Sequence, residues 1–349
     1  MTHEDINQLI QIRIEKGVEL RKSGVNPYSN GFRTTHTVSA ARALCEGKTG
    51  EELESSPEEY SLAGRIMAIN SFGKAIFLRI RDFTGQIQVF LKKDVLGEEV
   101  FQTVKRLDVG DFIGVRGRLF LTKTGELTLL AAGFHFLTKS VRPLPEKWHG
   151  LKDIETRHRQ RYVDLVMNPE VKEIFRIRAE IIKYIRNFLD AKGYLEVETP
   201  MLHPVLGGAN ARPFRTHHNT LDMDLYLRIA PELYLKRLVV GGMDRVYEIN
   251  KNFRNEGMSA RHNPEFTMIE FYQAYATYED LMALTEELLG GLVLKITGSH
   301  KIRKGETEID FTPPFRRLGI LDSLREYGGA REEDFASLEN AREFAVRCG

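Results

Sequence analysis

Two runs of alternating residues flank a charged loop in the second half of the chain, and they constrain the fold more than any other segment. The runs are "DRVYEINKNFR", residues 244–254, and "EFTMIEFYQAYA", residues 265–276. Alternation with a period of two is typical of β-strands that have two different faces. The runs therefore predict an antiparallel hairpin with a long connection.

The two faces of this hairpin differ in chemistry. One face is apolar and should pack on a core; it carries Tyr247, Ile249, Phe253, Ile269 and Phe271. The other mixes charged, amide and aromatic side chains: Glu248, Asn250, Asn252, Arg254 and Glu256 from the first run, with Phe266, Glu270 and Tyr272 from the second. A merely solvated face would explain the polar residues, but it would not call for aromatic rings among them.

We interpret the polar face as the floor of a site for a polar ligand that also has a flat ring. The ring of Phe266 can stack on a planar ligand. The guanidinium of Arg254 can hold an anion through two parallel hydrogen bonds. The alternative is a sheet face that is exposed to solvent and binds no ligand.

Composition limits the class of protein. At 349 residues the chain should bury at least one large core and divide into two domains with additional segments. Hydrophobic residues make up 42% and charged residues 28%, and no apolar run approaches the length of a membrane span, so we expect no membrane partner. Lysine and arginine total 50 against 49 aspartate and glutamate. A nucleic-acid partner must therefore bind a local surface.

The cysteines and the N-terminus indicate the compartment. Cys45 and Cys348 lie far apart and form no CxxC pair, so neither a disulfide framework nor a cysteine zinc site is expected. The first residues mix acids and bases and lack the apolar stretch of a secretory signal. We therefore expect a cytoplasmic protein, and we assign no metal ligands.

The first part of the chain predicts a helix followed by a small barrel. Residues 1–58 form an amphipathic helix, over 4–23, and an irregular connection. Residues 59–140 contain about five β-like runs with glycine turns and one helical interruption near 92–107. This pattern favours a barrel of the OB type, a fold that usually binds oligonucleotides or sugars.

The rest of the chain predicts a linker and a larger domain. Residues 141–165 read as an interdomain linker whose basic cluster is expected to be a solvated face. In the domain of residues 166–349, a long helix leads into a short strand. The segment "GGANARPF", residues 207–214, lets a backbone approach a ligand, although a plain loop explains it equally well. Taken alone, Glu232 is best explained by the helix macrodipole.

Several of these segments together resemble a known family. "FRNEG" followed by "RHNPEFTMIEFYQAY" is similar to motif 2 of the class II aminoacyl-tRNA synthetases, and "GYLEVETPML" resembles motif 1, which forms the dimer interface in that class. Within the class, "GGANARPF", "APELYLKR" and "RPLPEKWHGL" are characteristic of lysyl-tRNA synthetases. The aspartyl and asparaginyl enzymes share the architecture but differ in these stretches.

The resemblance implies an α+β fold and an activity. The fold would be an N-terminal five-stranded OB-type β-barrel, which binds the anticodon, followed by a class II catalytic domain with an antiparallel sheet flanked by helices. The activity would be ATP-dependent activation of L-lysine to lysyl-adenylate and its transfer to the 3′ end of tRNA(Lys). Because the lysine carboxylate and the α-phosphate repel each other, such a site must supply positive charge.

The resemblance also assigns roles to residues. Arg254 would be the catalytic residue that bridges the α-phosphate and the lysine carboxylate. Glu256, His262 and Asn263 would contact ATP, and Phe266 would stack under the adenine.

The same resemblance implies how lysine and tRNA bind. Lysine has two ammonium groups, which need carboxylates or hydroxyls when they are buried. Glu232 and the backbone near Gly208 would take the α-amino group, and Glu270 and Tyr272 would lie on the side of the ε-ammonium. The barrel residues that match the anticodon-reading positions are Arg65, Phe77, Gln88 and Glu126.

The end of the chain departs from the family pattern. Beyond residue 300 we find no counterpart of motif 3, of the carboxylates that hold Mg²⁺ or of the arginine that covers the adenine; "FRRL", residues 315–318, is no substitute. We therefore expect a chain that corresponds to about the first two-thirds of such an enzyme, with the Mg²⁺ ligands in the missing part. By itself it should activate lysine poorly or not at all.

Other functions stay open. One is an RNA-binding protein whose barrel is active and whose synthetase part is a non-catalytic remnant. Another is a lysine-activating ligase that modifies a protein, although the barrel over 60–138 counts against it, and a third is an aspartyl enzyme. Because motif 1 is intact, we predict a homodimer.

Overall fold

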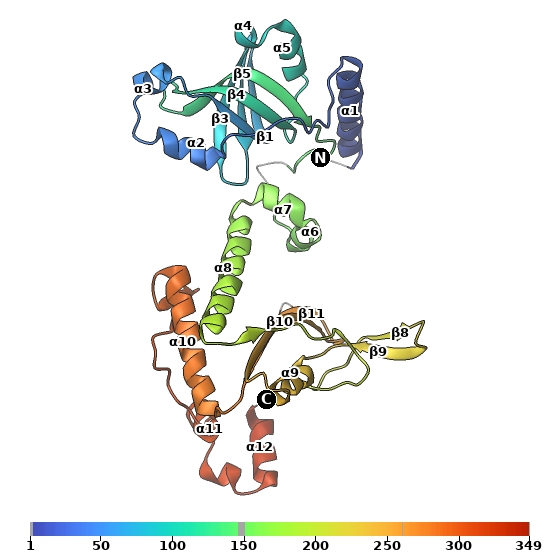
Figure 1. The fold of residues 1–349 in the computed structure, drawn as a ribbon, viewed down its shortest axis with the longest axis vertical. Coiled ribbons are helices and arrows are strands. Elements are labelled where there is room, and N and C mark those ends of the chain that lie inside the picture. The colour runs from blue at the N-terminus through green and yellow to red at the C-terminus, as the bar shows by residue number, and fades with distance from the viewer. Residues whose placement is uncertain (1–2, 146–150, 260, 349) are drawn as a thin grey trace. The chain divides into compact units, whose positions relative to one another are not determined.

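The computed structural model describes residues 3–145, 151–259 and 261–348 (Figure 1). The chain divides into two compact units, Met1–Val171 and Lys172–Gly349. The N-terminal unit contains helices and one barrel, and the C-terminal unit contains small sheets and helices.

The strands of the N-terminal unit form a five-stranded barrel in the order β1-β2-β3-β5-β4. Strand β1 pairs antiparallel with β2 along one side and with β4 along the other, which closes the barrel. The prediction of an OB-type barrel is confirmed, including the helical interruption between β3 and β4. The strands are β1 (Tyr60–Phe72), β2 (Ala75–Arg81), β3 (Gln86–Lys92), β4 (Phe112–Leu121) and β5 (Leu127–Thr138).

The helices of this unit surround the barrel and extend the chain beyond it. The expected N-terminal helix is present as α1, and the helical interruption is the pair α4 and α5. The helices are α1 (His3–Lys22), α2 (Val38–Cys45), α3 (Gly50–Ser55), α4 (Lys93–Leu96), α5 (Glu98–Val104), α6 (Ile154–Arg159) and α7 (Arg161–Met167).

Alternating apolar residues of the strands fill the barrel. Leu62, Ile80, Val89 and Leu129 are fully buried there, as expected for strands with one face toward a core. A glycine is required at one close approach of two strands. A Cβ atom added to Gly117 would lie 1.8 Å from the backbone oxygen of Leu130, beside a register shift in the β4–β5 pairing.

A charged cluster connects α1 to the barrel. The Lys139 ammonium is buried and donates to Asp108 at 2.5 Å and to Asp111 at 2.8 Å, while Lys16 of α1 donates to Asp108 at 2.7 Å. Burial opposes ionisation of Asp108, but the hydrogen bonds from Lys139 and Lys16 outweigh it and lower the pKa of this carboxyl. Such a network fixes α1 in one place.

The segment expected as a linker, residues 141–165, is helical in part. Residues 146–150 lie outside the described part of the chain, and α6 with the start of α7 follows them. Two arginines of the basic cluster bind a buried carboxylate: Arg157 donates to Asp164 at 2.7 Å, and Arg161 also donates to it. These arginines therefore stabilise the segment and are not simply a solvated face.

The C-terminal unit contains three small sheets. Their orders are β11-β10-β6, β7-β9-β8 and β12-β13. The strands are β6 (Leu195–Glu196), β7 (Leu202–His203), β8 (Arg215–His218), β9 (Met223–Leu227), β10 (Arg245–Phe253), β11 (Glu265–Gln273), β12 (Lys301–Lys304) and β13 (Thr307–Asp310); the helices are α8 (Glu170–Ala191), α9 (Glu232–Val240), α10 (Tyr278–Thr297), α11 (Ile320–Gly328), the short 3-10 helix η1 (Glu332–Phe335) and α12 (Leu338–Cys348).

One strand pairing differs from the expected antiparallel sheet. Strands β10 and β11 are antiparallel, but β6 pairs with β10 in parallel, so this sheet is mixed. A parallel pairing needs a long crossover connection. The chain provides one, because it leaves β6 through β7, β8, β9 and α9 before it returns as β10.

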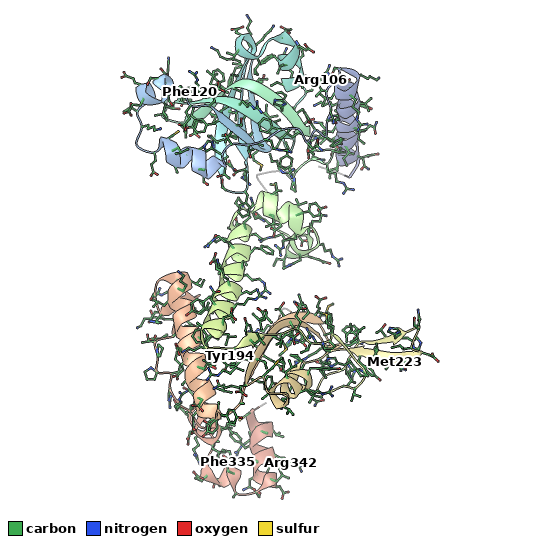
Figure 2. All side chains as sticks on the ribbon, in the orientation of Figure 1. Arg106, Phe120, Tyr194, Met223, Phe335 and Arg342 are labelled. Carbon is green, nitrogen blue, oxygen red and sulfur yellow. The ribbon has the colours of Figure 1, made fainter. Side chains whose placement is uncertain are left out.

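The apolar side of the mixed sheet packs on helices. Tyr247 of β10 is buried with Leu189 of α8, and Leu284 of α10 packs against this cluster. The ring of Tyr194, labelled in Figure 2, meets the ring of Phe271 edge-on with 6.0 Å between centroids. On the opposite side, Glu248, Asn250 and Asn252 of β10 are buried, whereas Phe266, Glu270 and Tyr272 of β11 are half-buried.

Candidate active site

The pairing of β10 with β11 decides which side chains share a face. Glu248 lies opposite Glu270, Asn252 lies opposite Phe266, and Val246 lies opposite Tyr272. Directly opposed residues of an antiparallel pair project to the same side. The structure thus confirms the predicted hairpin and its division into a core face and a polar face.

Arg254 and Phe266 meet at the end of the hairpin. The Cζ atom of Arg254 lies 5.1 Å from the centre of the Phe266 ring, which is the geometry of a cation–π contact. The backbone N–H of Arg254 donates to Pro264 O at 2.8 Å and holds the loop ends together. The Nε atom of Arg254 is buried and has no hydrogen-bond partner within the described residues. This donor is therefore free for a ligand anion.

The loop between the strands contacts the glycine-rich segment. Glu256 Oε1 accepts from the backbone N–H of Arg212 at 3.3 Å, and the N–H of Asn255 donates to Arg212 O at 2.8 Å. His262 bonds within the loop, where its Nδ1 lies 2.9 Å from Ser259 Oγ, and Asn263 is exposed beside it. Ala260, in the same turn, lies outside the described residues.

A second group of polar side chains lies farther along the same face. The Tyr272 hydroxyl donates to Glu270 Oε2 at 2.9 Å. The Lys236 ammonium donates to Glu232 at 2.6 Å and lies 5.9 Å from the centre of the Tyr272 ring. The structure therefore brings Glu232, Glu270 and Tyr272 together around one point.

The electrostatics of this group follow from burial and like charge. Burial raises the pKa of Glu270; the hydrogen bond from Tyr272 opposes the shift, and the negative charges of Glu232 and Glu248 add to it. Burial, together with the bond to Glu270, raises the pKa of Tyr272 as well. A buried carboxylate has lost hydrating water, so a cation that binds it lowers the free energy of its charged form.

Gly208 lies against the first turn of α9. Its φ of +87° belongs to the left-handed region that favours glycine, and an added Cβ would lie 3.0 Å from Glu232 Cβ and 3.2 Å from Ala230 Cβ. A side chain at Gly208 would therefore crowd Glu232. The contact explains the glycine and supports the expectation that backbone atoms here approach a ligand.

A buried ion pair beneath the site was missed by the sequence analysis. Arg228 and Glu248 are 1% and 3% exposed, and Arg228 Nη1 donates to Glu248 Oε1 at 2.7 Å. Arg228 also donates to the backbone oxygens of Lys251 at 2.9 Å and Thr199 at 3.1 Å. Arg228 lies just before α9 in the chain. Its guanidinium thus joins β10 to the segment that follows β6.

Both oxygens of Glu248 are also bound by Thr199. The hydroxyl donates to Oε2 at 2.7 Å and the backbone N–H donates to Oε1 at 3.3 Å. The only signal for this network in the sequence is a charged residue inside the apolar run "LYLRIAP".

The residues expected to bind tRNA do not all lie together on the barrel. Phe77 stacks on Phe90 with 4.3 Å between centroids and 5° between planes, and Gln88 on the same strand as Phe90 donates to Thr128 at 2.9 Å. Phe72 and Phe120 extend this aromatic cluster; Phe120 is labelled in Figure 2. Gln88 and Phe90 are two residues apart on one strand and therefore lie on the same face. This spacing in the sequence could have indicated that Phe90 lies beside Gln88.

Glu126 and Arg65 are held by other contacts. Glu126 lies 3.9 Å from the guanidinium of Arg42. Arg65 donates to Gly110 O at 3.0 Å, lies 4.2 Å from the ring centre of Phe112, and has a pKa lowered by burial. In β1 it pairs with one end of β2, whereas Phe77 is at the other end, opposite Asn70. The structure therefore does not bring Arg65 to the aromatic cluster.

Neither a metal site nor a membrane span is found in the described part of the chain. No group of three or more histidine, cysteine, aspartate or glutamate side chains there could hold a metal ion. No helix among the same residues is long and apolar enough to cross a membrane.

Comparison with known proteins identifies the family. The model of the "tRNA synthetases class II (D, K and N)" matches residues 153–344, and the model of the "OB-fold nucleic acid binding domain" matches residues 60–137. The chain belongs to the class II tRNA synthetases of this D, K and N group. Several relatives within that group are named Lysine--tRNA ligase.

Three such relatives show the extent of the similarity. The Lysine--tRNA ligase of Pelotomaculum thermopropionicum is 54% identical over 97% of this chain and 65% of its own length. Those of Carboxydothermus hydrogenoformans and an Anaeromyxobacter species are 51% and 56% identical, over 97% and 90% of this chain. The chain spans 68% and 62% of these two relatives.

Proposed function

We propose that the C-terminal unit binds ATP and L-lysine side by side and joins them as lysyl-adenylate. In this reaction a carboxylate oxygen of lysine attacks the α-phosphorus of ATP, the bond to the β-phosphate breaks, and pyrophosphate leaves with its electron pair. The lysyl group then passes to the 3′-terminal ribose of tRNA(Lys), and AMP leaves. We place this reaction in the cytoplasm.

The pairing of Arg254 with Phe266 on the polar face of the hairpin is the observation that carries the proposal. A guanidinium can hold the α-phosphate and the lysine carboxylate at once, which offsets their repulsion. The ring beside it suits a purine base. Glu256, His262 and Asn263, in the adjoining loop, would contact the same nucleotide.

The carboxylates of the site account for the choice of amino acid. L-lysine carries an ammonium group at each end, and this end of the polar face offers Glu232, Glu270 and the hydroxyl of Tyr272. We assign the α-amino group to Glu232 and the backbone near Gly208, and the ε-ammonium to Glu270 and Tyr272. Burial of Glu270 favours a ligand that brings its own positive charge.

The barrel is proposed to bind the anticodon of tRNA(Lys). Exposed bases of single-stranded RNA stack on aromatic rings and are read at their edges. Phe77 and Gln88 provide a ring and an amide on one face, and Glu126 and Arg65 complete the proposed contacts at the barrel surface. Phe90 supports the Phe77 ring from behind.

Exchange between ATP and pyrophosphate tests the catalytic proposal. We expect exchange that requires L-lysine and that disappears in Arg254→Ala and Glu270→Gln, while Lys304→Ala, an exposed change in β12, leaves it unchanged. Exchange that persists in Arg254→Ala would refute the assigned role of Arg254.

An RNA-binding protein with a non-catalytic synthetase part is the second candidate. The closed barrel with its Phe77–Phe90 stack favours it, because this unit needs nothing from the C-terminal unit to present an aromatic surface. Gel shifts distinguish the two. Binding of tRNA that is weakened in Phe77→Ala, in a chain that binds neither ATP nor L-lysine, would favour the second candidate.

A further inference from the structure

Three carboxylates face the proposed lysine site, and they differ in what already binds them. Glu248 is permanently occupied, because the buried guanidinium of Arg228 and both donors of Thr199 take its two oxygens. Glu248 therefore cannot serve as a ligand for an incoming ammonium group. The charge that the site can offer comes from Glu232 and Glu270.

Glu270 is only partly occupied. Its Oε2 atom accepts the hydroxyl of Tyr272, and within the described residues no hydrogen bond to Oε1 is formed. Glu232, in contrast, already has a cation. The ammonium of Lys236, one helical turn along α9, donates to Glu232 Oε1 at 2.6 Å.

The pair of Lys236 with Glu232 is exposed and therefore exchangeable. Their side chains are 55% and 31% accessible to solvent, against 2% and 4% for Arg228 and Glu248. When two oppositely charged, exposed residues lie one turn apart on a helix, their ion pair changes an equilibrium constant for folding or binding by only about twofold. A buried pair cannot open without leaving a charge unsatisfied, so Lys236 is the mobile cation of the site and Arg228 the fixed one.

The Lys236 ammonium is close to the three side chains assigned to the ammonium groups of the ligand. Besides its bond to Glu232, it lies 5.9 Å from the centre of the Tyr272 ring, and its charge acts on Glu270 to lower the pKa of that carboxyl. An ammonium group at the end of a four-carbon chain is also the group that L-lysine would bring. The protein thus places in its own site the same chemical group, an alkylammonium, that L-lysine would bring.

We propose that Lys236 is an internal substitute for the ligand's ammonium group, held by Glu232 until the α-amino group of lysine displaces it. The proposal rests on the proposed function for the identity of the ligand. It makes Lys236 a residue that sets affinity and selectivity without bonding to the substrate. Displacement frees Lys236 to move into solvent and leaves the net charge of the site unchanged.

Calorimetric titration of L-lysine into the whole chain tests the displacement. Lys236→Met keeps most of the length of the side chain and removes its charge, so L-lysine no longer competes with Lys236 for Glu232 and its Kd should fall by about twofold. The matched control is Lys192→Met, because Lys192 also bonds a glutamate, Glu287, at 2.6 Å and lies 5.5 Å from an aromatic ring, that of Phe188. The control should leave the Kd unchanged. A Kd that is unchanged or higher in Lys236→Met overturns the proposal.

A second probe separates this proposal from the proposed function. Lys236→Ala removes three carbons and the ammonium, which n-propylammonium can replace. We expect n-propylammonium chloride to raise the Tm of Lys236→Ala more than that of Lys192→Ala, with sodium chloride as the ionic control. This result supports the internal substitute even if the parent chain binds no L-lysine, a finding that would contradict the proposed function alone. Equal responses of the two alanine variants overturn the substitute whether or not L-lysine binds.

Discussion

At the scale of single residues, the site depends on side chains whose hydrogen bonds are incomplete. The Nε donor of Arg254 and one oxygen of Glu270 lack partners within the described residues, although both side chains are partly buried. A buried donor without a partner, such as the Arg254 Nε, costs free energy in the absence of a ligand. The two atoms also define where an anion and a cation gain most by binding, and these two places lie on one face of one hairpin.

The raised pKa of Glu270 predicts a pH dependence with opposite signs for binding and stability. Burial raises this pKa above the 4.5 of a free glutamate. As the pH falls through the folded-state pKa, Glu270 becomes neutral and L-lysine should bind more weakly. The same group stabilises the fold at low pH, and that contribution is lost as the pH rises through the folded-state pKa.

Titrations of L-lysine between pH 4.5 and 7, with thermal unfolding at each pH, measure both effects. Glu270→Gln should weaken binding at neutral pH and flatten both profiles. If the parent chain and Glu270→Gln show the same pH profile, Glu270 does not contact the ammonium group.

Phe266→Ala tests the stacking of the nucleotide. Loss of a base–aromatic contact typically costs about 1–3 kcal/mol, so the affinity for ATP should fall by that amount, and the affinity for L-lysine should change little. Equilibrium dialysis with labelled ATP gives the first value and calorimetry gives the second. An unchanged affinity for ATP would remove Phe266 from the proposed site.

At the scale of elements, a two-stranded hairpin, one helix and one glycine-rich segment place all the proposed ligand contacts. Strand β11 presents Phe266, Glu270 and Tyr272, α9 presents Glu232, and the Gly208 backbone packs on the first turn of α9. The buried guanidinium of Arg228 connects β10 to the chain entering α9. It therefore sets the separation between the carboxylates of α9 and of the hairpin.

Removal of one partner of the buried pair should destabilise the C-terminal unit strongly. Arg228→Met leaves Glu248 buried without its cation, which typically costs about 3–5 kcal/mol. The double variant Arg228→Met with Glu248→Met should recover much of that loss, because it leaves no unpaired charge. Urea denaturation of the parent and the two variants measures these differences. A single variant as stable as the parent would show that the pair does not hold the elements together.

The sequence was sufficient to predict the hairpin but not the buried contacts and the strand pairing that hold it in place. The period of two placed Glu270, Tyr272 and Phe266 on one face, because alternation alone decides the side of a strand. The partners of Arg228 come from Thr199, Glu248 and Lys251, which only the folded chain brings together. The parallel pairing of β6 escaped prediction for the same reason.

The barrel shows the same division between local and tertiary information. Strand patterns and glycine turns predicted its five strands, but residue parity could not show that Arg65 and Phe77 lie at opposite ends of the β1–β2 pair. The distance along a strand pair depends on register, which two short runs do not fix. The pairing of Lys236 with Glu232, by contrast, could have been read from their spacing of four residues.

At the scale of the whole molecule, the C-terminal unit exposes apolar side chains where a second copy is proposed to bind. Ile174 on α8 and Leu195 on β6 are 64% and 54% exposed. Leu195 lies in the stretch that resembles motif 1, and Ile174 lies on the helix that precedes it. Exposed apolar residues on one helix and its following strand are typical of an interface between subunits.

We therefore expect a homodimer that Ile174→Glu disrupts. Light scattering at micromolar concentration should give the dimer mass for the parent and the monomer mass for the variant. Val346→Glu, at an even more exposed apolar position on α12, should leave the dimer intact. A monomeric parent chain would contradict the proposed interface.

The central claim is that one site of this chain recognises both ends of L-lysine, and competition between amino acids tests it most directly. Calorimetry should give one L-lysine per chain, with L-norleucine, which has the same length but no ε-ammonium, bound at least about tenfold more weakly because Glu270 is then left unpaired. If L-norleucine binds as tightly as L-lysine, or if L-lysine does not bind, the carboxylates of the hairpin do not form a lysine site.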